Sequence, residues 1–289
     1  MHDHYAPSPA VVVGVDGSRS AVGAALWAVD EAVSRDIPLR LVYAIDPDSH
    51  PDADPGDAAR ALATAEIAVR QAFMAVESTD KPVKIEIEIL QKTPTRALVE
   101  SSRSAALLCV GSLGLKHSGQ GRIGSTAAAL ATASHCPVAI VHGFDSHRAH
   151  QGWVVAELDG FSTLDAVLLC ALEEARLREL PLRVLTTWHS RYTDIHAPNA
   201  VADGNRLARA RLDRRLDEWR RRYPDLDVEA VAVHGSALNY FAREAGSIKL
   251  LVIGHERADG IRELVGPPGY ATLHQAGCSV LVCEPGNVL

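Results

Sequence analysis

The feature that most constrains this chain is an internal repeat spanning half of its length. A shift of 143 positions places Ile37–Val42 over Leu180–Leu185, and the same shift places Leu107–Gly111 over Leu250–Gly254. Near the end of each copy the shift falls to 142, so a single deletion separates the copies across a whole domain length, which makes chance resemblance improbable. The 289 residues therefore contain two copies of one domain. We place the two domains at residues 1–145 and 151–289, joined by the polar stretch 142–151.

Each copy alternates short apolar runs with segments of helical pattern. In the first copy, the apolar runs indicate buried strands near residues 10–15, 39–45, 83–90, 107–110 and 137–142. Helical patterns lie between them near 19–35, 57–78, 94–104 and 124–134. This alternation predicts a parallel sheet with helices on both faces, and right-handed crossovers make it doubly wound. We expect an α/β fold with two tandem five-stranded parallel sheets of strand order 3-2-1-4-5. The expected class is Rossmann-like.

A glycine-rich loop follows the fourth expected strand of the first copy. The segment GSLG, from Gly111 to Gly114, is followed by nine residues and then by Gly124 and Ser125 at a helix start. A phosphate needs converging backbone N–H groups without obstructing side chains, which glycine provides. The helix N-terminus adds unpaired N–H groups and a positive dipole end, and the hydroxyls of Ser125 and Thr126 can donate to phosphate oxygens. The pattern predicts a phosphate-binding loop.

Asp16 ends the first expected strand, as Gly111 ends the fourth. In an open parallel sheet, ligands bind beyond the carboxyl ends of the strands at the switch point, which here lies between strands one and four. Asp16 could hydrogen-bond a nucleoside or hold a divalent metal ion. The alternative interpretation is an Asp-Gly turn that caps the next helix. Because the glycine loop is expected beside Asp16, we favour the role in ligand binding.

These motifs resemble those of a known family. The opening VVVGVDGS, the GSLG loop, the GS at 124–125 and the ending HCPVAIVH resemble the universal stress protein family, in its tandem, two-domain actinobacterial type. The resemblance covers nearly the whole chain, and it implies a Rossmann-like fold similar to that of the adenine-nucleotide alpha hydrolases. It implies that Asp16 lies at the nucleoside and that the backbone of Ala44 meets adenine. It also implies that ATP, with or without Mg²⁺, is held through its phosphates and ribose by Gly111, Gly114, Gly124 and Ser125, with Thr126 beside them.

The second copy departs from the phosphate-binding pattern. Gly254 is kept, but Arg257 stands at the second glycine position, and the closing pair is Gly266-Pro267. Proline has no N–H, so a donor is lost where the helix should meet phosphate. Asp159 is retained, and the bulky Phe161 follows it. We predict that only the first copy binds nucleotide; the alternative is a direct phosphate contact by Arg257.

Several activities lack their motifs in this sequence. The patterns GxxxxGK[ST], GxSxG and HExxH are absent, as is a paired Cys/His metal site. We therefore expect no enzyme activity beyond slow, incidental ATP hydrolysis. Three hypotheses stay open: an ATP-binding stress-response regulatory protein, with a cyclic-AMP binder as its variant; a slow ATPase that uses Asp16 and a metal; and a nucleotide-free interaction scaffold. The family resemblance also implies a homodimer, with the two copies of each chain associated as an internal pseudo-dimer.

Charge and composition limit the partners. The formal net charge of −7 argues against a general nucleic-acid binder. No apolar run approaches the roughly 20 residues that span a bilayer, and the N-terminal residues lack a secretory pattern. Five cysteines without metal-like spacing suit a reducing compartment. We expect a cytoplasmic protein with an adenine nucleotide as its ligand, and neither nucleic acid nor membrane as a partner.

One basic segment stands out in the second copy. Residues 206–222 contain eight arginines, which could indicate a surface for anions or RNA. However, Leu207, Leu212 and Leu216 recur at helical spacing, and acidic residues offset part of the charge. We interpret this segment as a solvated helix face.

Overall fold

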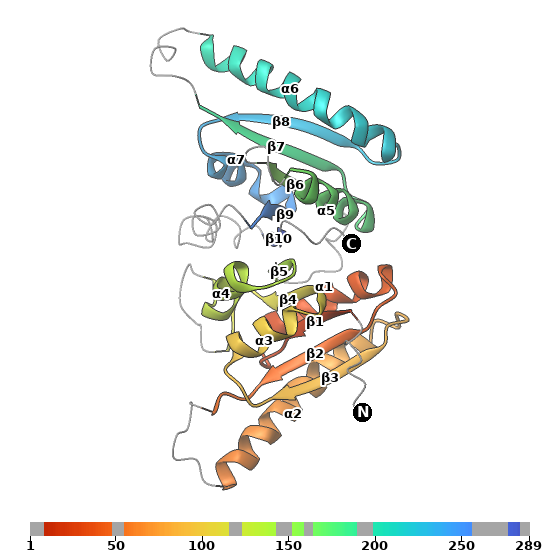
Figure 1. Cartoon of the computed structure of the whole chain (residues 1–289), viewed down its shortest axis with the longest axis vertical. Helices are drawn as coiled ribbons and strands as arrows, with labels where there is room; N and C mark the ends of the chain where they lie inside the picture. The colour runs from red at the N-terminus through yellow and green to blue at the C-terminus, as the bar shows by residue number, and fades with distance from the viewer. Residues whose placement is uncertain are drawn as a thin grey trace, which may run out of the picture. The chain divides into compact units, whose positions relative to one another are not determined.

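The computed structural model describes residues 9–47, 55–115, 123–142, 152–158, 164–189, 199–255 and 277–283. The chain divides into two compact units, Met1–Phe144 and Asp145–Leu289 (Figure 1). Each unit is an α/β structure built on a parallel sheet. Among the helices of the described residues, none combines the length and the apolar composition that crossing a membrane requires.

The first unit contains a five-stranded parallel sheet in the order β3-β2-β1-β4-β5. Its central strands are fully apolar and buried, as expected for a sheet covered on both faces. The strands are β1 (Ala10–Gly14), β2 (Leu39–Ala44), β3 (Ile85–Leu90), β4 (Ala105–Gly111) and β5 (Val138–Val141). The predicted strand order is confirmed.

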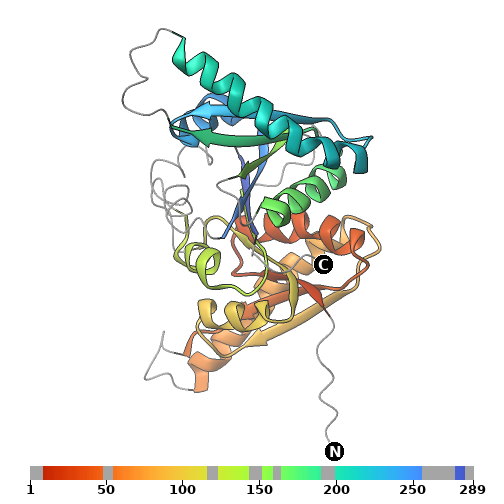
Figure 2. The same cartoon turned by 45° about the horizontal axis from the view of Figure 1, so that its top comes forward.

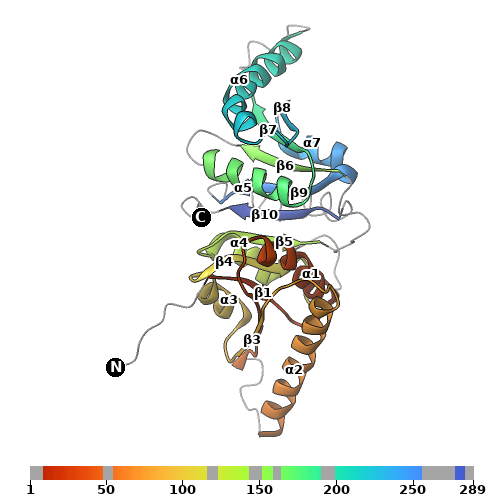
Figure 3. The ribbon, with the colours of Figure 1, turned by 90° about the vertical axis from the view of Figure 1, so that its right-hand side faces the viewer.

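Two pairs of helices cover this sheet. The helices are α1 (Arg19–Ser34), α2 (Pro55–Glu77), α3 (Pro94–Ser102) and α4 (Ser125–Ala133). The helix α1 packs against α2, and α3 packs against α4. Figure 3 shows the first pair on one face of the sheet and α3 on the other, as right-handed crossovers require. The first unit is therefore doubly wound, as predicted.

The second unit repeats this arrangement in the order β8-β7-β6-β9-β10. Its strands are β6 (Trp153–Leu158), β7 (Leu182–Trp188), β8 (Val228–His234), β9 (Ile248–Gly254) and β10 (Ser279–Cys283). Its helices are α5 (Leu164–Leu177), α6 (Ala200–Arg222) and α7 (Ala237–Glu244), followed by the short 3₁₀ helix Ala245–Ser247. Gly14 faces Val42 between β1 and β2, and the residues 143 positions later, Glu157 and Leu185, face each other between β6 and β7. The sequence repeat is thus a repeat of strand register.

Two details differ from the sequence-based expectation. The helix α2 begins at Pro55, two residues earlier than predicted, because proline is well suited to the first turn of a helix. Leu207 was assigned to the apolar face of α6, and this was wrong. Its side chain is 54% exposed, whereas Leu212 and Leu216 are buried. At 3.6 residues per turn, Leu207 points well away from the other two leucines.

Candidate functional site

The candidate site of the first unit lies at the carboxyl ends of β1 and β4. These neighbouring strands pair in register, with Gly14 opposite Val110. After β1 the chain turns into α1 toward β2, whereas after β4 it leads through the glycine loop to α4 and β5. Because the two connections diverge, a crevice is expected at this switch point. The structure brings the end of β1 and the glycine loop together there.

The carboxylate of Asp16 joins the two sides of this crevice. Its Oδ1 accepts a hydrogen bond from the Ser18 N–H at 2.9 Å, and its Oδ2 accepts one from the Leu115 N–H at 3.1 Å. The first bond is the Asp-Gly turn considered from the sequence, but the residue that caps α1 is Ser18, whose Oγ accepts from the Ala21 N–H. The second bond reaches across 99 positions of sequence to the glycine loop. Asp16 therefore holds the turn and contacts the loop at once.

Two serines that the sequence analysis did not single out also contact the loop. The Ser18 hydroxyl donates to the Leu113 carbonyl at 3.4 Å, and the Leu113 N–H donates to the Ser20 Oγ at the same distance. Both serines stand at the beginning of α1. The Ser-x-Ser spacing directly after the Asp-Gly turn was the available signal.

Glycine is needed at Gly111 and at Gly114 for different structural reasons. A Cβ at Gly111 would lie 2.5 Å from the Ser20 Oγ and 2.8 Å from the Ala21 backbone nitrogen, so glycine is required for the close packing of β4 on α1. A Cβ at Gly114 would meet only the Asp16 Oδ2, at 2.9 Å, within a 4 Å radius. Gly111 thus serves packing, while Gly114 leaves space beside the Asp16 carboxylate.

The other end of the loop leads into α4. The Gly124 N–H donates to the Ser112 carbonyl at 2.9 Å, which ties the two ends of the loop together. Gly124 is the N-cap residue of α4 and offers no side chain to the N–H groups of the first turn. Ser125 is exposed and Thr126 is half-buried beside these donors. An uncapped helix N-terminus of this kind suits an anion.

The end of β2 lies within electrostatic reach of Asp16. Ala44 is the last residue of β2 and faces Leu90 of β3, and the next residue, Ile45, donates its N–H to the Leu90 carbonyl at 2.8 Å. Burial raises the pKa of the Tyr43 hydroxyl above its usual value, and the negative charge of Asp16 raises it further. Tyr43 was not among the predicted site residues. The structure thus places Ala44 on the strand next to Asp16, with Tyr43 as an additional neighbour.

The described residues offer no cluster of three or more His, Cys, Asp or Glu side chains that could hold a metal ion. The loop residues 116–122 between Leu115 and α4 lie outside the described part of the chain.

The corresponding switch point of the second unit, between β6 and β9, carries a buried carboxyl side chain. Glu157 stands where the first unit has Gly14, and it is only 4% exposed. Gly254 ends β9 as Gly111 ends β4, and the His255 N–H donates to the Cys283 carbonyl as the Ser112 N–H donates to that of Val141. The other differences predicted from sequence lie outside the described residues: Asp159, Phe161, Arg257, Gly266 and Pro267.

The doubly wound parallel sheet, with a glycine loop at its switch point, defines a Rossmann-like α/β protein that carries this domain twice. The sequence profile of the universal stress protein family matches residues 9–142 and again residues 154–284. The chain therefore belongs to the universal stress protein family, in its tandem form.

Individual relatives agree with this assignment. A universal stress protein of Mycobacterium tuberculosis (strain ATCC 25618 / H37Rv) is 49% identical over 286 residues, covering 98% of both chains. Another universal stress protein of that strain is 45% identical over 285 residues, also covering 98% of both. Among solved structures, a universal stress protein from Archaeoglobus fulgidus superposes with a TM-score of 0.68 at 14% identity, covering 96% of this chain and 97% of that one. At this identity the structural likeness concerns the fold.

Proposed function

We propose that the first unit binds an adenine nucleotide, ATP in particular, and that the chain is a regulatory protein of the stress response. The observation that carries this proposal is the bond from the Leu115 N–H to the Asp16 carboxylate. This bond joins the end of β1 to the glycine loop, and the bond from the Gly124 N–H to the Ser112 carbonyl joins the loop to the N-terminus of α4. All three lie at the switch point, where α/β sheets bind nucleotides.

The charges of the proposed site predict the orientation of the bound nucleotide. The carboxylate of Asp16 repels phosphate, and it accepts hydrogen bonds, so it suits the hydroxyls of ribose or the N–H groups of a base. Phosphate suits the other end, where Gly124, Ser125 and Thr126 begin α4. Gly114 leaves room between the two ends. Mg²⁺ that accompanies ATP would be held chiefly by the phosphates, because magnesium sites commonly use one or two carboxylates together with substrate phosphates.

We further propose that the second unit does not bind nucleotide in this manner. The buried Glu157 replaces Gly14 at its switch point. A side chain at this position changes the packing of the switch point, because even a Cβ at Gly14 would lie 2.8 Å from the Leu98 Cδ1. The sequence of the second glycine loop, with Arg257 and Pro267, supports the same asymmetry.

Regulation rather than catalysis is part of the proposal. Hydrolysis needs a group that positions and activates water. Two backbone N–H groups fix the orientation of the Asp16 carboxylate, and in this proposal its remaining lone pairs accept from the nucleoside and not from an attacking water. We therefore propose that ATP hydrolysis is slow and incidental, and that the bound nucleotide acts by favouring one loop arrangement over another.

Calorimetric titration of the full chain with ATP, ADP, AMP and cyclic AMP tests this function. We expect one ATP per chain, and loss of binding in Gly114→Arg, which fills the space beside Asp16. The matched control is Gly246→Arg, because a Cβ at Gly246 meets nothing within 4 Å and the residue lies in the second unit. If none of the four nucleotides binds, the proposal is wrong. Tighter binding of cyclic AMP than of ATP would favour the cyclic-AMP alternative, and multiple turnovers that depend on Asp16 would favour the ATPase.

Separately, we propose that the chain forms the homodimer that the family resemblance implies. Sedimentation of the full chain should give twice the mass of one chain. A monomer mass at micromolar concentration would overturn this part and leave the nucleotide proposal unaffected.

A further inference from the structure

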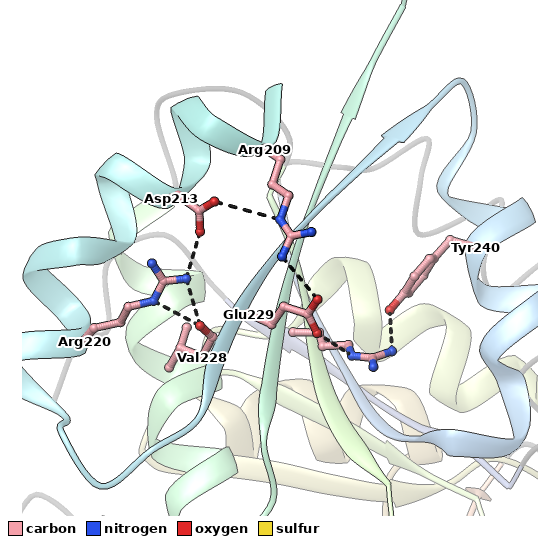
Figure 4. Close-up of polar contacts among 7 residues, drawn as sticks. Arg209, Asp213, Arg220, Val228, Glu229 and Tyr240 are labelled. Atoms are coloured by element: carbon pink, nitrogen blue, oxygen red, sulfur yellow. Dashed lines mark hydrogen bonds and ion pairs between the residues drawn. The ribbon is translucent and has the colours of Figure 1, made fainter. Parts of the chain in front are cut away.

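Two groups of arginines on α6 differ in their contacts within the unit. Arg220 donates to the Val228 carbonyl at 3.0 and 2.9 Å and pairs with Asp213 at 2.9 Å. Arg209 lies 3.5 Å from a Glu229 oxygen and 3.9 Å from an Asp213 oxygen. Figure 4 shows these bonds between α6 and the beginning of β8. This group attaches the helix to the sheet, so its charges are used within the unit.

A second group of arginines points away from the sheet. Arg211, Arg214 and Arg221 are exposed, and no ion pair joins any of them to another described residue. At 3.6 residues per turn, they share about 80° of the helix circumference with two further exposed residues. We call this set the outer stripe of α6: Leu207, Arg211, Arg214, Glu218 and Arg221. The buried Leu212 and Leu216 face the other way, toward the sheet.

The fold does not require this charge. The helix α2 occupies the equivalent position in the first unit and has the same length of 23 residues. Its outward side chains include Ile67 and Met74, which are 69% and 58% exposed, and it carries only Arg60 and Arg70 as basic residues. Like charges one turn apart also destabilise a helix slightly. The arginines of the outer stripe therefore occur in the second unit only, and the fold that the two units share does not require them.

We propose that the outer stripe of α6 is a docking surface for an acidic amphipathic helix of a partner protein. A guanidinium group matches a carboxylate with two parallel hydrogen bonds, so three arginines at helical spacing fit carboxylates at helical spacing. Leu207, 54% exposed, offers an apolar contact at one end of the stripe. Figures 1 and 2 show α6 lying over β7 and β8, with its outer side uncovered by other elements of its own unit.

Glu218 distinguishes a protein partner from a nucleic acid or an anionic membrane. It stands between Arg214 and Arg221 in the outer stripe, and no ion pair joins it to another described residue. A phosphate backbone or an anionic lipid surface presents negative charge everywhere and is repelled at this point. A helix can place a lysine opposite Glu218 and carboxylates opposite the arginines.

A designed helical peptide tests the docking surface on the full chain. The labelled peptide carries glutamates spaced to face Arg211, Arg214 and Arg221, a leucine to face Leu207 and a lysine to face Glu218, and fluorescence anisotropy measures its binding. Reversal of the three arginines (R211E/R214E/R221E) should weaken binding at least about tenfold, since each exposed pair contributes up to about 1 kcal/mol. The control R60E/R70E/R103E makes the same charge change at exposed positions of the first unit and should leave binding unchanged.

The variant Glu218→Lys separates the partner classes. It should weaken peptide binding several-fold, because two lysines then face each other. It should strengthen any binding of an oligouridine RNA or of phosphatidylserine vesicles, which serve as comparison probes. The proposal is overturned if the wild-type chain binds either comparison probe more tightly than the peptide, if it does not bind the peptide at low salt, or if Glu218→Lys strengthens peptide binding. These measurements need no nucleotide, so their outcome is independent of the proposed ATP site.

Discussion

At the scale of single residues, Asp16 has a structural role beside the ligand-binding role that we propose for it. Its two oxygens accept from Ser18 and Leu115, and its charge reaches Tyr43. A residue in this position orders the crevice before any ligand arrives. Preorganised donors and acceptors lower the entropy lost on binding.

Replacement of Asp16 by asparagine should therefore affect both properties. The amide keeps one acceptor oxygen, so one of the two backbone N–H groups loses its partner. We expect the free energy of unfolding to fall by about 1 kcal/mol, as measured by urea unfolding, and ATP affinity to fall as well. Asp36→Asn is the control, because Asp36 has a positive φ of 53° that asparagine tolerates. Unchanged stability and affinity in Asp16→Asn would contradict the bridging role.

The Tyr43 hydroxyl makes stability depend on alkaline pH. Its pKa is raised in the folded state, first by burial and then by the charge of Asp16. Between the usual value of 10.0 and the raised folded value, the unfolded chain loses this proton while the folded chain keeps it. The contribution of Tyr43 to the free energy of unfolding should thus be fully present below pH 10 and be lost as the pH rises above 10. Urea unfolding across this pH range should show a smaller decline in Tyr43→Phe. Part of the decline should remain, because burial also raises the pKa of Tyr240.

At the scale of elements, the glycine loop follows β4, contacts α1 and leads into α4. Gly111 packs against the first turn of α1, whereas Gly114 faces the Asp16 carboxylate. The two glycines belong to one sequence motif, but Gly111 is required for packing on α1, whereas Gly114 is required beside the Asp16 carboxylate.

Alanine substitutions should separate these requirements. Gly111→Ala forces a methyl group against the backbone of Ser20 and Ala21, so we expect a loss of about 1–3 kcal/mol in the free energy of unfolding. Gly114→Ala brings a methyl group to 2.9 Å from the Asp16 Oδ2 that accepts from Leu115, so we expect a smaller loss of about 0.5–1 kcal/mol. Calorimetry should nevertheless detect weaker ATP binding in Gly114→Ala. Equal stability of the two variants would argue against this division.

The elements were predictable from the sequence where burial imposes a pattern. The strands β1 and β4 are continuous apolar runs because both of their faces are covered, and they were predicted to within a few residues. The loop contacts of Ser18 and Ser20 were not predictable, since they join residues more than 90 positions apart through single hydrogen bonds. Leu207 was misassigned because an apolar residue at approximate helical spacing need not lie on the buried side.

At the scale of the whole molecule, the two units share strand register but differ in chemistry at two equivalent places. The switch point carries Gly14 in one unit and the buried Glu157 in the other. The outermost helix exposes Ile67 and Met74 in one unit and the arginines of the outer stripe in the other. A duplicated domain can thus divide its roles, with ligand binding proposed for one copy and partner binding for the other.

This division predicts an uneven response of the molecule to nucleotide. Saturating ATP, at about 100 times its dissociation constant, should stabilise the unit that binds it by about 2.7 kcal/mol. Hydrogen exchange of the full chain should then slow at Leu113 to Leu115 and at the first turn of α4, where the N–H groups of the proposed site lie. The N–H groups of Glu256, Arg257 and Ala258, 143 positions after Leu113–Leu115 in the sequence, should exchange at unchanged rates, and Glu157→Gln should not alter this result. Equal protection in both units, or a stoichiometry of two ATP per chain, would show instead that both copies bind nucleotide.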